Sequence, residues 1–111
     1  MKKDDTVYLK HILDAIGDIH AFLKGMNRES FLNNKAIRYA VVRSLEIIGE
    51  ASKHLSKGFR EKHKDIPWDD ICGMRDKLIH DYIGVDYTIV WKAIEKGVPT
   101  LKKKIKGILS R

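Results

Sequence analysis

The sequence has little cysteine and no hydrophobic run of membrane-spanning length. Cys72 is its single cysteine. It cannot form an intrachain disulfide and has no metal-ligand pattern nearby, so we expect a small apolar packing residue in a reducing compartment. No apolar run approaches the roughly 18 residues of a membrane span. Because Met1–Asp5 leads into an interrupted amphipathic pattern rather than an apolar block, we expect no signal peptide. A cytoplasmic protein without a membrane role is expected.

The sequence also lacks long strand patterns, internal repeats and low-complexity linkers. Alternation of apolar and polar residues never extends beyond about four positions, as a strand would require. The 111 residues are enough for one domain, 1–111, that buries roughly 65% of the surface of the unfolded chain. We therefore predict an all-α fold, a bundle of four to five helices.

Helical spacing of apolar residues supports this fold class from the N-terminus onward. After the capping and acidic residues Asp4–Thr6, apolar residues recur every three or four positions from Tyr8 to Leu23, which predicts a long amphipathic helix. Gly17 inside it is expected to permit close approach of another helix. The segment 25–27 closes it, and a single helical turn is expected at 28–32.

A second long helix is predicted from the Asn34 N-cap, with a wide apolar face from Ile37 to Leu55 and an end at Gly58. Its charged residues have two readings. Arg43 with Glu46, or Glu46 with Glu50, could be catalytic, but charges at this spacing on an exposed helix face are more often solvated partners, which we favour. A short helix or loop is expected at 59–64.

The second half of the chain predicts two further helices. Pro67 suits a first helical position, and Trp68 after it is either a core anchor, which we favour, or a base-stacking platform. That helix is expected to bend at Gly73 and to end at Gly84. The last helix should start from an Asp86 cap and keep one apolar face through a kink at 96–99.

The net charge of +7 is concentrated in the second half of the chain. Residues 1–56 hold nine basic and seven acidic side chains, whereas residues 57–111 hold thirteen and eight. Such a balance suits a polyanionic partner, foremost a nucleic acid. A solvated lysine-rich surface is the alternative, and the basic residues of the tail at 102–104 and 106 fit either interpretation.

The densest chemistry lies in the stretch from Arg75 to Tyr82, which also holds Asp76 and His80. An arginine offers a planar fork for phosphate oxygens, and a histidine can move a proton near neutral pH. On a helix, Asp76 and His80 share a face, so the carboxylate could orient the imidazole. Arg75 and His80 point roughly 140° apart. A cleft between two helices, or between two copies of this helix, could bring them together.

The Arg-X4-His-X-Tyr arrangement of Arg75, His80 and Tyr82 resembles the signature of HEPN domains, and in particular the HepT-like toxins of toxin–antitoxin modules. Further similarity comes from Ile47–Ala51, Pro67–Trp68, Gly84–Asp86 and Val90–Trp91. It therefore covers nearly the whole chain. Val42 stands where the family usually has a glutamate, so no role is carried over for that position.

The resemblance implies a HEPN-like helical bundle that forms a homodimer with a composite ribonuclease site. Metal-independent, cofactor-free RNA cleavage is implied, with His80 as general acid or base and Arg75 stabilising the transition state. Asp76, where the family often has asparagine, could orient His80. Tyr82 matches a tyrosine that a partner nucleotidyltransferase antitoxin can modify with AMP.

Other interpretations of the same residues remain open. Arg75 and His80 could hold a nucleotide or RNA without cutting it, in a binding module regulated by a partner protein. They could also belong to a structural charge network at a helix end, with Asp76–His80 and Arg75–Asp81 as ion pairs. His11 and His20, nine residues apart, lack companions at metal-ligand spacing, so no metal site is expected.

Overall fold

The computed structural model describes residues 2–80 and 84–111, without the side chains of Ile79 and His80, and the regular structure in these ranges is entirely helical. This confirms the predicted all-α fold class. The elements are α1 (Lys3–Phe22), α2 (Arg28–Leu32), α3 (Lys35–His54), α4 (Lys57–Lys62), α5 (Trp68–His80), α6 (Tyr87–Lys92), a π-helical turn (Ala93–Gly97) and α7 (Val98–Leu109).

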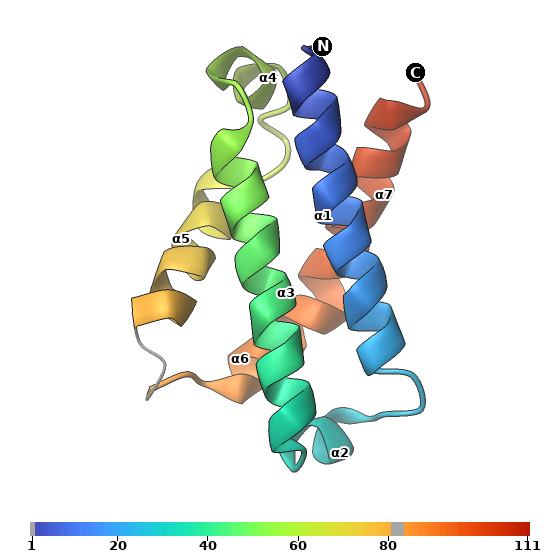
Figure 1. Ribbon diagram of the computed structural model, residues 1–111, viewed down its shortest axis with the longest axis vertical. Helices are drawn as coiled ribbons and strands as arrows, with labels where there is room; N and C mark the ends of the chain where they lie inside the picture. The colour runs from blue at the N-terminus through green and yellow to red at the C-terminus, as the bar shows by residue number, and fades with distance from the viewer. Residues whose placement is uncertain (1, 81–83) are drawn as a thin grey trace.

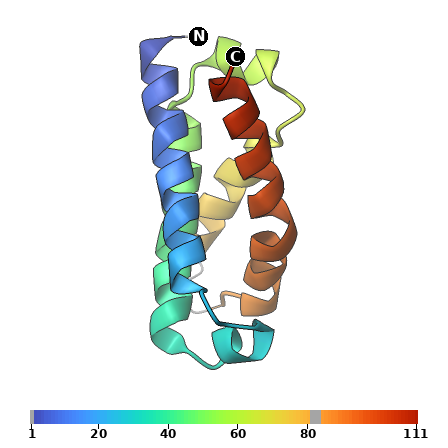
Figure 2. The same ribbon diagram turned by 90° about the vertical axis from the view of Figure 1, so that its right-hand side faces the viewer.

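Four long helical rods form the bundle in the described part of the chain, and its principal extents are 41 × 29 × 20 Å. Helix α1 and helix α3 run antiparallel side by side, α5 packs on the other side of α3, and α6 continues through the π turn into α7 as the fourth rod (Figures 1 and 2). The short helices α2 and α4 lie at opposite ends. For the described residues, this arrangement of long rods agrees with the predicted bundle of four to five helices.

The core is built from the apolar face of every rod. Trp68, which is 5% exposed, packs beside Phe59 and donates its indole N–H to the carbonyl oxygen of His63 at 3.1 Å. The interpretation of Trp68 as a core anchor is therefore confirmed. The other large buried residues include Leu9, Ile12, Ile16, Ile19, Phe31, Val41, Leu45, Ile48, Ile66, Leu78, Val90, Leu101 and Ile105.

The helix ends follow the predicted caps with two corrections. The Asn34 side chain accepts from the Ile37 N–H at 3.0 Å, as expected for an N-cap. The predicted end of the second helix at Gly58 is wrong, because α3 ends at His54 and Ser56 caps α4, whose range includes Gly58. Asp5 does not cap α1. It is buried and accepts from both the N–H and the hydroxyl of Ser56 at 2.7 Å, which ties the start of α1 to the start of α4.

The glycine that permits a close helix contact is also not the predicted one. A Cβ built on Gly17 would meet nothing within 4 Å, so the expectation of a close approach there is wrong. The close approach lies at Gly49, where α3 meets α5. Helix α1 ends at Phe22, and Gly25 in the turn that follows has a φ of 77°, which favours glycine.

The last rod stays helical through the segment where a kink was predicted, with a π turn at Ala93–Gly97. Asp86 accepts from the Thr88 N–H at 3.0 Å, which confirms the expected cap. Pro99 has no N–H for the α-helical ladder, and the wider π turn just before α7 lets the rod continue past it. Helix α5 runs through Gly73 without a break, while its predicted end at Gly84 depends on residues 81–83, which are outside the described ranges. Within those ranges, none of the helices has the length and apolar character to cross a membrane.

Candidate active site

Arg75 occupies the crossing point of α3 and α5. An added Cβ at Gly49 would lie 2.1 Å from the Arg75 Cβ, 2.8 Å from its Cγ and 3.2 Å from the carbonyl oxygen of Ile71. The missing side chain at Gly49 thus leaves the space that the first carbons of Arg75 fill. Cys72 lies at the same contact, with its Sγ 3.9 Å from the Gly49 carbonyl oxygen, and burial raises the pKa of its thiol. The helix contact fixes where the arginine leaves the backbone.

Two carboxylates hold the guanidinium of Arg75. Its Nη2 lies 2.8 Å from Glu50 Oε2, and its Nη1 donates to Asp76 Oδ1 at 2.8 Å. The side chain is 24% exposed, so the fork reaches the surface while its stem is covered. The hydrogen bond to Asp76, followed by the charge of Glu50, raises the pKa of Arg75. The guanidinium carries a fixed positive charge and still has N–H groups for another oxygen acceptor.

Asp76 and Glu50 each bind a second basic side chain. Lys53 donates its Nζ to Asp76 Oδ1 at 2.6 Å, and this bond, followed by the one from Arg75, lowers the pKa of the Asp76 carboxyl. On the other side, His54 Nε2 lies 3.2 Å from Glu50 Oε1. The five side chains form one alternating network across the α3–α5 surface.

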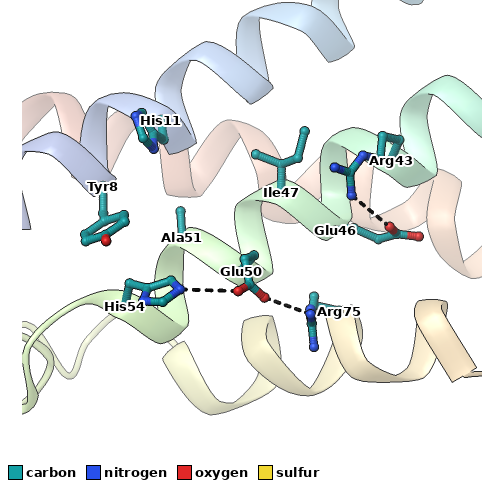
Figure 3. A pocket seen from close by; sticks show the side chains of 9 residues that line it. All are labelled: Tyr8, His11, Arg43, Glu46, Ile47, Glu50, Ala51, His54 and Arg75. Carbon is teal, nitrogen blue, oxygen red and sulfur yellow. Dashed lines mark hydrogen bonds and ion pairs between the residues drawn. The ribbon is translucent and has the colours of Figure 1, made fainter.

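This network borders a cleft of about 440 Å³ between α1, α3 and α5 (Figure 3). Arg75 lies toward one end of the labelled group, together with the ion pair of Arg43 Nη1 and Glu46 Oε2, which are 3.4 Å apart. Tyr8 stacks on His54 at the other end, with ring centroids 5.1 Å apart. The full lining is Tyr8, His11, Arg43, Glu46, Ile47, Glu50, Ala51, His54 and Arg75.

The residues predicted for the site are brought together only in part. Arg75 and Asp76 are in direct contact. His80 belongs to the last described turn of α5, five positions after Arg75, but its side chain is not described. Tyr82 and Asp81 lie outside the described residues. The Asp76 carboxylate binds Lys53 and Arg75, so its contact with His80 stays a prediction.

Sequence reasoning missed Glu50, His54 and Tyr8 as members of this site. Glu50 was favoured as a solvated charge on the outer face of its helix, whereas it lies against Arg75. The available signal was the Ile47–Ala51 segment, where Gly49 and Glu50 are adjacent. The preference for a solvated pair does hold for Arg43, whose side chain is 71% exposed.

The cleft places the permanently charged guanidinium of Arg75 on the same surface as polar and aromatic side chains. Such a set can bind an anionic oxygen and stabilise charge that develops on it. Among the described residues there is no group of three or more His, Cys, Asp or Glu side chains that could hold a metal ion.

Comparison with known proteins gives the family. The model of the family described as "Ribonuclease HepT-like" matches residues 12–108. The chain is 51% identical over 109 residues to "Putative RNase TTE0752" of Caldanaerobacter subterraneus, covering 98% of this chain and 97% of that one. It is 44% identical over 108 residues to "Probable ribonuclease HepT" of Thermococcus cleftensis, covering 97% and 98%. No solved structure matches. The chain belongs to the HepT-like ribonuclease family of the HEPN superfamily.

Proposed function

We propose that this protein is a metal-independent endoribonuclease and the toxin of a toxin–antitoxin module. The observation that carries the proposal is the placement of Arg75. Its guanidinium is held at the border of the cleft, and Arg75 lies on the same helix, α5, as His80. The names of the relatives support RNA as the substrate. The positive net charge of +7 favours attraction of a polyanion.

In the proposed reaction, the 2′-hydroxyl of the RNA attacks the adjacent phosphorus. A bond forms between O2′ and phosphorus, the bond from phosphorus to O5′ breaks, and the products end in a 2′,3′-cyclic phosphate and a 5′-hydroxyl. His80 acts as general base toward the 2′-hydroxyl or as general acid toward O5′. Arg75 stabilises the negative charge on the oxygens of the phosphorane-like transition state.

A homodimer is the proposed working unit. Positions five apart on a helix lie roughly 140° apart around its axis, so positions 75 and 80 of one copy fall on different sides of the α5 axis. Two copies whose α5 helices face each other can combine Arg75 of one with His80 of the other. Gel filtration with light scattering tests this, and a monomer that cleaves RNA would contradict it.

Neutralisation by a nucleotidyltransferase antitoxin completes the proposal. Transfer of AMP from ATP to the Tyr82 hydroxyl forms a phosphodiester and releases pyrophosphate. The added phosphate, two residues from His80 in sequence, would occupy the position of the RNA phosphate and repel the substrate. Intact mass of the protein co-expressed with a neighbouring nucleotidyltransferase should show AMP increments, which Tyr82→Phe abolishes.

The decisive experiment incubates the purified protein with end-labelled single-stranded RNA in the presence of a chelator. His80→Ala and Arg75→Ala should each lower cleavage by about 10²-fold or more, while circular dichroism and oligomeric state stay unchanged. His20→Ala and Arg28→Ala, at exposed positions outside the cleft, are the matched controls and should cleave like the wild type.

Three outcomes would contradict parts of the proposal. Cleavage by both site variants at the rate of the wild type would refute the assignment of Arg75 and His80. Inhibition by the chelator would refute the metal-independent reaction. RNA binding without any product at any protein concentration would instead support a non-catalytic RNA- or nucleotide-binding module.

A further inference from the structure

The end of the cleft opposite Arg43 is lined by aromatic rings from two helices. Tyr8 on α1 stacks on His54 of α3 at 5.1 Å and an interplanar angle of 15°. His11, one turn further along α1, meets the Tyr8 ring edge-on at 5.9 Å. The side chain of His54 is 53% exposed and His11 is exposed as well. Tyr8 itself is half-buried and packs against the core, so its ring supports the two exposed histidine rings at the cleft.

Between this aromatic end and the arginines, α3 supplies an apolar stretch. Ile47 and Ala51 lie between the rings and Arg43 in the close-up view (Figure 3) and line the cleft with them. Charged groups flank them, because Glu50 binds both His54 and Arg75. The cleft therefore offers aromatic rings at one end, apolar contact in the middle, and at the other end two arginines that are each paired with a glutamate.

This order of groups matches one unit of a single-stranded nucleic acid. A nucleotide base stacks on an aromatic ring and packs against apolar side chains, while the phosphates on either side of it bind arginines. A purely apolar ligand would leave the charged side chains of the cleft without solvent or partners. A small anion without a ring would leave the aromatic end unused.

We infer that the Tyr8–His11–His54 cluster is a base-stacking subsite for single-stranded RNA, which holds a nucleotide next to the phosphate bound at Arg75. The inference rests on the proposed function for the identity of the polymer. It adds a substrate contact on α1, a helix outside the Arg75–Tyr82 motif. The subsite orients the strand by its base and leaves the chemistry to the motif residues.

The test measures binding separately from cleavage. The probe is a fluorescein-labelled 2′-O-methyl RNA octamer, which has no 2′-hydroxyl nucleophile, and its affinity is read by fluorescence anisotropy. Tyr8→Leu removes the ring and should weaken binding by about 5- to 150-fold, the range for the loss of one stacked base. Tyr8→Phe keeps the ring and should restore the affinity that Tyr8→Leu loses.

A second probe isolates the base. A sugar–phosphate oligomer of the same length and charge, without bases, should bind the wild type and Tyr8→Leu with equal affinity. Phe22→Leu is the matched control, since it also replaces an exposed aromatic residue of α1 by leucine but lies outside the cleft. It should bind the octamer like the wild type, and the unfolding temperature of each variant checks that the fold is intact.

The outcomes separate this inference from the proposed function. Equal affinity of Tyr8→Leu and wild type for the octamer overturns the subsite even if the wild type cleaves RNA. Base-dependent, Tyr8-dependent binding by a protein that never cleaves supports the subsite and overturns the ribonuclease. If 5′-AMP alone competes as tightly as the octamer, the cluster is a mononucleotide site and the inference of an RNA subsite is wrong.

Discussion

Gly49→Ala is the substitution that the structure predicts most sharply. The new methyl carbon would lie 2.1 Å from the Arg75 Cβ and 3.2 Å from the Ile71 carbonyl oxygen. Carbon atoms in contact lie about 3.5–4.0 Å apart, so α5 has to move away from α3 by roughly 1.5 Å at this point. A backbone oxygen and a Cβ cannot swing aside as the tip of a long side chain can. The displacement therefore affects the whole helix contact.

The magnitude follows from two opposing effects. Overpacking of a close contact lowers the free energy of unfolding by about 1–3 kcal/mol. Replacing a helical glycine by alanine raises it by about 1 kcal/mol. We expect a net loss of up to about 2 kcal/mol in the free energy of unfolding. The rate of RNA cleavage should fall about 10²-fold even though the protein stays folded, because a shift of about 1 Å in a catalytic group can lower the rate by that factor. Urea unfolding and RNA cleavage measure the two effects on the same preparation.

Gly17→Ala is the matched control for this substitution. Gly17 also lies inside a long helix, but its added Cβ would meet nothing within 4 Å. It should gain up to about 1 kcal/mol from helix propensity and cleave RNA like the wild type. If Gly49→Ala is as stable and active as Gly17→Ala, the argument that glycine positions Arg75 is refuted.

Three further predictions concern buried and paired groups. Asp5→Ala leaves the N–H and hydroxyl of Ser56 without their buried acceptor and should cost about 1–3 kcal/mol in urea unfolding, whereas the exposed Asp4→Ala should stay within about 0.5 kcal/mol. Because the pKa of Asp76 is lowered in the fold, its ion pairs stabilise the protein above the ordinary carboxyl pKa, and this contribution is lost as the pH falls through the lowered value. The unfolding temperature of wild type minus that of Asp76→Asn should then shrink with acidification; a constant difference would contradict this. The raised pKa of the Cys72 thiol predicts slow alkylation by iodoacetamide at pH 7.5 that accelerates in urea, and equal rates would show that burial does not protect it.

The sequence was sufficient to predict the long helices, because each of them carries its apolar residues at helical spacing. The series from Tyr8 to Leu23 and from Ile37 to Leu55 predicted α1 and α3, since local periodicity and capping side chains determine where a helix forms. The change in helix geometry before Pro99, a π turn at Ala93–Gly97, was anticipated as a kink at 96–99 because proline has no N–H for the helical ladder. The error at Gly58 arose because Ser56, an equally good cap, starts a new helix two residues earlier.

Contacts across helices could not be read in this way. Asp5 lies in the first turn of α1 as predicted, but its contact with Ser56 was not foreseen, and Glu50 was taken for a solvated charge. A helical pattern shows which face a residue occupies but not what that face meets. Gly17 and Gly49 have the same local signal, and only the crossing of α3 and α5 distinguishes them. The cleft depends likewise on Tyr8 and His54, which are 46 positions apart in the sequence.

By itself, the sequence determined the helical fold, the location of the Arg75–Tyr82 motif and the family resemblance, because these depend on residue types at short spacing. The tertiary structure decided which groups hold Arg75 and which surface adjoins it. Helix packing brings Glu50, Asp76 and Lys53 into one charge network and the aromatic residues of α1 to the edge of the same cleft. These are long-range contacts, and their geometry is set by how closely helices approach rather than by the pattern within any one of them.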